Sequence, residues 1–96
     1  MKIKHWQGYG TVNAEKVSKK TAGGITTLVV RVSGNHEWGL IRDDEYDLKT
    51  WLVKRFDKSF DPGNRVAYSY DSGYRNNGKV DEEYCVYTFQ YRSGCE

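Results

Sequence analysis

Disulfides, membrane segments and targeting signals have little basis in this sequence. It contains one proline and two cysteines, Cys85 and Cys95, among 96 residues. Two cysteines at these positions do not make a disulfide scaffold, so we expect both to be reduced. The first residues lack the apolar run of a signal peptide, and no stretch of about 18 apolar residues occurs. We therefore expect a soluble, cytoplasmic protein without a membrane partner.

A strong charge of either sign is also missing. The chain has 15 basic and 13 acidic residues, which leave a formal net charge of +2 at pH 7. This bias is too small to imply a polyanionic partner by itself. Hydrophobic residues make up 38% of the chain and aromatic residues 15%, which excludes a disordered protein. The length predicts a single domain over residues 1–96 with one core.

Residues 44–58 carry the one convincing helical period. Four large apolar residues fall on one face of the expected helix: Leu48, Trp51, Leu52 and Phe56. Three basic residues are expected to point elsewhere: Lys49, Lys54 and Arg55. Acidic residues crowd the start and basic residues the end, as the helix dipole favours, and the N-cap is either Asp44 or Asp47.

The N-terminal half predicts three strands. Residues 3–17 form the first of them. Residues 25–33 are rich in β-branched side chains and have apolar groups at both alternating positions, which predicts a central strand covered on both faces. Gly34–Asn35 is a two-residue turn signal that leads into a third strand over residues 36–42. The second and third strands should therefore form a hairpin.

The last third of the chain predicts a long hairpin, because Asn77–Gly78 is a turn signal between two tyrosine-rich runs. A turn centred there pairs Tyr70 with Cys85 and Val66 with Phe89. One face of this hairpin is mostly aromatic: Val66, Tyr68, Tyr70, Cys85, Tyr87, Phe89 and Tyr91. We expect this face to meet the helix. The predicted fold is α+β, an antiparallel sheet of about five strands in the order β-β-β-α-β-β with one amphipathic helix packed on one face.

Residues suited to catalysis or metal binding are sparse. The two histidines are His5 and His36, and we expect both at the surface. His36 and Glu37 are neighbours on a predicted strand, so they face opposite sides and cannot both address one substrate. A structural zinc site needs a short-spaced pair of ligands, which the sequence lacks. We predict no enzymatic activity, no metal and no cofactor.

The stretch from Gln7 to Lys16 suggests that the protein binds nucleic acid. Its Gly-Tyr-Gly around Tyr9 resembles the aromatic strand of an RNA-recognition motif, and its Gly-Thr-Val and Asn-Ala-Glu-Lys fragments resemble the first strands of a cold-shock domain. In a cold-shock domain those fragments are separated and precede the Gly-Tyr-Gly, whereas here they are fused and follow it. The RNA-recognition pattern also expects apolar residues where Thr11 and Asn13 stand. The resemblance implies a base stacked on Tyr9.

Lysines near this stretch complete the alternative function, which is single-stranded nucleic-acid binding. Tyr9 would stack a base beside a basic hairpin tip that contains Lys16, Lys19 and Lys20. Lysines at these positions are more typical of an edge strand and its tip, where they discourage pairing between sheet edges.

Acidic clusters and aromatic residues favour a protein partner. One helix spans only part of a five-stranded sheet, so some of the aromatic residues should remain exposed: Trp38, Tyr74, Tyr84 and Tyr91. An exposed aromatic residue rimmed by charge is a typical protein-binding anchor. The predicted contact residues combine both features: Trp38, Tyr74, Asp43, Asp44, Asp81, Glu82 and Glu83.

Residues Thr26 to Val32, Trp38 to Ile41 and the helix from Leu48 to Phe56 are similar to the ββα core of some anti-CRISPR inhibitors. These are small proteins of phages and mobile elements, and the similar region spans about a third of the chain. The resemblance implies a stoichiometric binder that blocks a larger, nucleic-acid-handling host complex by occupying its surface. The identity of the partner and the oligomeric state stay open.

Overall fold

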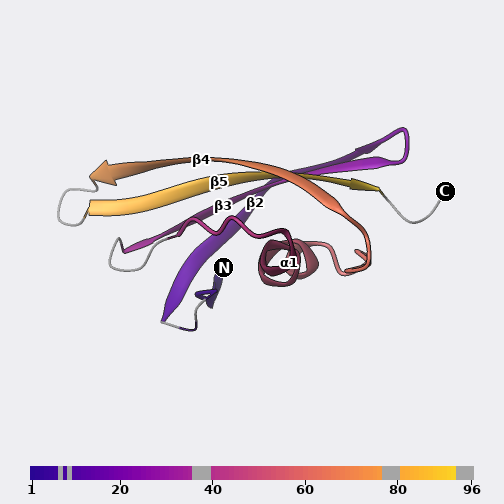
Figure 1. The fold of residues 1–96 in the computed structure, drawn as a ribbon. Coiled ribbons are helices and arrows are strands. Elements are labelled where there is room, and N and C mark those ends of the chain that lie inside the picture. The colour runs from indigo at the N-terminus through magenta and orange to yellow at the C-terminus, as the bar shows by residue number, and fades with distance from the viewer. Residues whose placement is uncertain (7, 9, 36–39, 77–80, 93–96) are drawn as a thin grey trace.

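A computed structural model describes residues 1–6, 8, 10–35, 40–76 and 81–92, with the backbone alone at 35, 74–76 and 81–82. The chain forms one five-stranded antiparallel sheet with a helix against one of its faces (Figure 1). The sheet order is β1-β2-β3-β5-β4. The strands are β1 (Lys2–Lys4), β2 (Thr11–Ala22), β3 (Ile25–Asn35), β4 (Val66–Asn76) and β5 (Asp81–Arg92). The predicted fold class is confirmed.

The predicted first strand over residues 3–17 is wrong, because the chain reverses within it. β1 and β2 are separate antiparallel strands, and Ile3 lies beside Val12. Gly8 and Gly10 have φ angles of 82° and 73°, which other residues rarely adopt. The two glycines of this stretch therefore turn the chain instead of continuing a strand.

The predicted hairpin between β3 and a strand over residues 36–42 is also wrong. Residues 36–39 lie outside the described part, and residues 40–44 are not in a strand. β3 pairs with β2 along one edge and with β5 along the other, so no third strand can pair beside it. The order β-β-β-α-β-β nevertheless holds, because the broken first strand supplies two strands.

β3 is central, but only one of its faces is covered. Four even-numbered residues are buried on the face that the helix covers: Thr26, Leu28, Val30 and Val32. The odd-numbered residues Thr27, Val29, Arg31 and Ser33 are half-exposed on the other face. The prediction of cover on both faces is therefore wrong, and one side of the sheet stays open (Figure 1).

The β4–β5 hairpin has the predicted faces in a different register. Tyr70 pairs with Tyr87 and Val66 with Tyr91, a shift of two residues from the predicted pairs. The last pair that forms is Asn76 with Asp81, and the predicted turn residues lie outside the described part. Because side chains alternate between faces, a shift of two residues leaves every side chain on its predicted face. Cys85, Tyr87 and Phe89 are buried as expected. Tyr91 is also buried, so it is not one of the aromatic residues that remain exposed.

The helix runs continuously from Glu45 to Phe56. It consists of α1 (Glu45–Leu48), a wider π-helical turn η1 (Lys49–Val53) and α2 (Lys54–Phe56). Asp44 is the N-cap, because its Oδ1 accepts a hydrogen bond of 3.1 Å from the Asp47 N–H. The helix lies beneath the sheet (Figure 1).

The helix buries the predicted apolar face and one unexpected residue. Leu48, Trp51 and Leu52 are buried as predicted, and Phe56 is half-buried. Lys49 is buried too, which contradicts its predicted outward position. Its Nζ lies 3.1 Å from Glu45 Oε2 and donates to the Pro62 carbonyl, so its charge is compensated.

The core lies between the helix and the inner face of the sheet. Its largest fully buried side chains come from β3, β5, the helix and the segment before the helix: Tyr87, Phe89, Leu28, Leu40, Leu48 and Leu52. In the described part of the chain, no helix is long and apolar enough to cross a membrane.

Candidate functional site

Four of the predicted protein contacts meet at one end of the sheet. Tyr74 in β4 pairs with Glu83 in β5, and Glu82 pairs with Asn35 at the end of β3. Asp81 is the first residue of β5 at the same end. The structure describes only the backbone of Tyr74, Asp81 and Glu82, and Trp38 lies outside the described residues.

Among the predicted acidic contacts, the side chains that the structure describes have partners within the chain. Glu83 Oε1 accepts a hydrogen bond of 3.2 Å from the Leu40 N–H. Asp43 Oδ1 accepts one of 2.5 Å from the Tyr68 hydroxyl, which raises the pKa of Tyr68 to about 12. Asp43 and Asp44 nonetheless remain exposed, so they are accessible to a partner.

Tyr87 holds the segment of residues 40–44 against the sheet. Its hydroxyl accepts a hydrogen bond of 2.7 Å from the Arg42 N–H and donates one of 3.1 Å to the Leu40 carbonyl. Burial raises the pKa of Tyr87, so the hydroxyl keeps the proton that it donates. This segment leads from beneath β5 to the start of the helix and places Asp43 beside β4.

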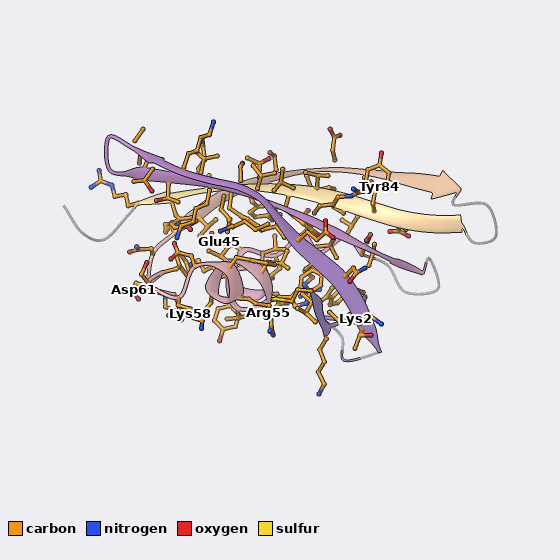
Figure 2. All side chains as sticks on the ribbon, turned by 180° about the vertical axis from the view of Figure 1, so that it is seen from behind. Lys2, Glu45, Arg55, Lys58, Asp61 and Tyr84 are labelled. Carbon is orange, nitrogen blue, oxygen red and sulfur yellow. The ribbon has the colours of Figure 1, made fainter. Side chains whose placement is uncertain are left out.

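β4 is an edge strand, so one edge of its backbone has no neighbouring strand in the described sheet. Glu45 Oε2 accepts a hydrogen bond of 3.0 Å from the Val66 N–H, so this amide points away from β5. Backbone groups alternate in direction along an antiparallel strand, so those of Tyr68, Tyr70 and Ser72 point the same way. The bond from Val66, followed by the contact with Lys49, lowers the pKa of Glu45. Figure 2 shows Glu45 between the helix and the sheet.

The two edges of the sheet carry opposite charge. On the described side chains of β1 and β2 there are five lysines and one glutamate: Lys2, Lys4, Lys16, Lys19, Lys20 and Glu15. At the other edge, the described side chains of residues 43–45 and 65–73 include four acidic residues and one arginine: Asp43, Asp44, Glu45, Asp71 and Arg65. We call β4 with these four acidic residues the acidic edge. Sheet order places the two groups apart, because β1 and β2 lie at one side of the sheet and β4 lies at the other.

The open face of the sheet offers few large apolar side chains. Tyr84 lies on this face, on the side of the sheet away from Arg55 and Lys58 (Figure 2). The Arg31 guanidinium lies 5.5 Å from the centre of its ring. A Cβ atom on Gly73 would lie 2.8 Å from the Tyr84 hydroxyl, so the ring covers this glycine. Tyr84 is therefore occupied by contacts within the sheet.

The lysines predicted for nucleic-acid binding do not form one patch. Lys19 faces the helix side, where its Nζ lies 3.3 Å from Asp57 Oδ1. Lys20 pairs with Thr27 and faces the open side. At about 3.3 Å per residue, Thr11 and Lys19 lie about 26 Å apart along β2. Lys16 and Lys20 are exposed, and Tyr9 lies outside the described residues.

Asp57 lies at the end of the helix beside a cavity of about 360 Å³. It accepts hydrogen bonds of 2.7 Å from the Ser59 hydroxyl and from the Tyr91 hydroxyl. Burial alone would raise the pKa of Asp57, but the bonds from Ser59, Tyr91 and Lys19 outweigh it and lower the pKa to about 2. Burial also raises the pKa of Tyr91. Neither group exchanges protons near neutral pH, so the cluster is not suited to acid–base chemistry there. Its contacts instead connect β2 and β5 to the end of the helix.

The remaining candidates for chemistry are enclosed. His5 is 2% exposed and stacks on Trp6 with ring centres 5.0 Å apart, so its predicted surface position is wrong. The reversal between β1 and β2 causes this burial, because it folds His5 toward Trp51 of the helix. Cys85 is free and buried, and burial raises its pKa to about 11. Among the described residues, no group of three or more His, Cys, Asp or Glu is placed to hold a metal ion.

The chain was compared with protein-family models, curated proteins and solved structures. None of them matches. The geometry of the two edges is therefore the basis for the functional argument.

Proposed function

We propose that this protein is a non-enzymatic protein-binding module whose acidic edge faces a basic surface of its partner. The separation of charge between the two sheet edges carries this proposal. Complementary charge steers association and disfavours wrong partners, and the acidic edge combines such charge with the exposed Tyr70 ring. The exposed fraction of Tyr70 is 40%, which leaves it accessible as an aromatic contact.

Surface occlusion is the mode of action that fits this edge. A complex that handles nucleic acid holds the phosphates with lysine and arginine, so its working surface is basic. An acidic edge bound there would displace the nucleic acid without any chemical step. The resemblance to small inhibitors of phages and mobile elements supports the same mode of action.

Site-specific photo-crosslinking in an extract of the native host tests this proposal. A photoreactive residue at Tyr70, on the acidic edge, should give one discrete protein adduct. The same residue at Val17, which is 60% exposed on the opposite edge, is the matched control and should give none. Asp71→Lys should reduce the adduct at position 70. Equal adducts from both positions, or adducts that nuclease treatment removes, would contradict the proposal.

Nucleic-acid binding is the second candidate, and the exposed lysines of β1 and β2 favour it. The test is binding of labelled single-stranded RNA and DNA at about 50 and 200 mM salt, because phosphate contacts weaken steeply over this range. The informative variant is Lys16→Glu with Lys20→Glu. Lys19 should stay unchanged, because a glutamate there would lie against the buried Asp57 carboxylate. Tight binding that this variant abolishes would favour this candidate over the first.

A further inference from the structure

We propose that β4 binds an extended, basic peptide segment of the partner by strand addition. This inference rests on the proposed function, because it specifies how a protein partner contacts the acidic edge. In strand addition the main chain supplies the hydrogen bonds and the side chains supply the specificity. β4 offers both, as the backbone and side-chain contacts indicate.

The backbone of β4 provides a row of free hydrogen-bonding groups. The N–H and C=O groups of Tyr68, Tyr70 and Ser72 point away from β5 and are spaced about 6.6 Å apart. Val66 begins the same row, and its N–H already donates to Glu45 Oε2. For the rest of the row, the described residues supply no such acceptor. An added strand would continue the pattern that Glu45 starts.

β4 lacks the features that protect sheet edges from pairing. Proteins usually guard such edges with lysine, proline, a bulge or a very short strand. β4 has 11 residues, contains neither lysine nor proline, and pairs with β5 without a shift in register. At the opposite edge β1 is very short, and β2, which extends beyond it, has three lysines and a bulge between Lys16 and Ser18. The contrast between the two edges marks β4 as the one suited to pairing.

The side chains beside this row select a basic segment. Asp71 is exposed on the open face, and the small side chain of Ser69 on the same face leaves room for a long basic side chain. On the helix side, Asp43 lies against Tyr68. The Tyr70 ring packs on Tyr87 with centres 5.8 Å apart and presents an exposed surface to an apolar cross-strand neighbour.

The same charges argue against a second copy of this chain as the occupant. Two acidic edges brought together would place the acidic residues of one copy near those of the other. Like charges facing each other across a strand pair are destabilising. A lysine- or arginine-bearing segment gains the interaction that a second copy would lose.

Binding of a synthetic peptide tests the inference directly. The probe is a labelled peptide of about ten residues in which lysine and valine alternate, a length typical of long strands. We expect saturable binding to the protein by fluorescence anisotropy. The same peptide with glutamate in place of lysine should bind at least about tenfold more weakly because of charge repulsion. A version methylated on alternate backbone nitrogens should also lose about tenfold, because it lacks the donors that face β4.

Three protein variants locate the bound peptide. Ser72→Pro removes an amide that faces the free edge and leaves the pairing with β5 intact, so binding should weaken about tenfold. Asp71→Lys should weaken it to a similar extent. Glu15→Lys makes the same change of charge on the opposite edge and should leave binding unchanged. Thermal unfolding of each variant checks that the fold is retained, and the methylated peptide gives the same answer without any protein variant.

The possible outcomes separate the inference from the function on which it rests. Absence of saturable binding, or binding that methylation does not weaken, would overturn strand addition. A stable dimer that excludes the peptide from β4 would also overturn it. If the peptide fails but crosslinking at position 70 captures a partner, the proposed function stands with another contact mode. If both fail, the proposed function fails as well.

Discussion

Asp57→Asn is expected to lower the free energy of unfolding at pH 7 by about 2 kcal/mol, because it removes the charge that strengthens the hydrogen bonds to this buried carboxylate. Asp57 is 5% exposed and binds Lys19, Ser59 and Tyr91. A carboxylate at a helix C-terminus is unfavourable by itself, so these three donors make it stabilising. Urea unfolding measures the change.

The pH dependence of this variant provides a second test. The pKa of Asp57 is lowered from 3.8 to about 2 in the folded protein. Because the pKa of Asp57 is lower in the folded protein than in the unfolded chain, the carboxylate stabilises the fold at pH values above about 4. This stabilisation is lost as the pH falls from about 4 through about 2. The contribution is about 2 kcal/mol, so the difference between wild type and Asp57→Asn should narrow below about pH 4. A difference that does not change with pH would contradict this.

Asp61→Asn is the matched control for Asp57→Asn. Asp61 is exposed, and its Oδ1 accepts a hydrogen bond of 2.9 Å from the Gly63 N–H. An asparagine keeps that acceptor, so the free energy of unfolding of Asp61→Asn should stay within about 0.5 kcal/mol of wild type. Equal losses from both substitutions would mean that the contacts of Asp57 are not specific.

Tyr87→Phe is expected to destabilise the fold by about 2 kcal/mol. It removes one hydroxyl and leaves two backbone groups, the Arg42 N–H and the Leu40 carbonyl, without their partner. Leu40 is fully buried, so water cannot easily replace the lost bond. Urea unfolding gives the stability, and the amide signal of Arg42 should move because its acceptor is gone.

Tyr70→Phe is the control for this substitution. Tyr70 lies on the same face of the hairpin but is exposed, so loss of its hydroxyl should change stability by less than about 0.5 kcal/mol. If the two substitutions cost the same, Tyr87 does not hold residues 40–44 in place. The position of Asp43 on the acidic edge would then need another explanation.

Local patterns in the sequence predicted the helix and the faces of the last hairpin. Leu48 and Leu52 repeat at the helical period within a few residues, so their shared face needs no knowledge of the rest of the chain. Alternation likewise assigned Tyr87 and Phe89 to the core. It did so despite the wrong register, because a shift of two residues keeps every side chain on its face.

Contacts between distant segments could not be predicted in this way. Gly34–Asn35 looks like a turn, but pairing with β5 extends β3 through both residues. The hydrogen bond between Arg42 and Tyr87 joins residues 45 positions apart, and no local pattern predicts it.

The acidic edge was only partly foreseen. Asp43 and Asp44 were predicted as contacts from their charge alone, whereas Tyr70 and Asp71 were not among the predicted contact residues. Their role depends on β4 lying at an edge of the sheet, and strand order is a global property of the fold. The free backbone edge of β4 also follows from strand order, so no local pattern in the sequence predicts it.

Amide hydrogen exchange of β4, measured by NMR with and without the lysine–valine peptide, tests the central claim most directly. In the free protein the amides of Tyr68, Tyr70 and Ser72 should exchange quickly, and those of Ser69 and Asp71, which face β5, slowly. The peptide should slow the first three and leave the other two unchanged. Protection of all five amides in the free protein, or peptide binding that leaves the first three fast, would contradict the account.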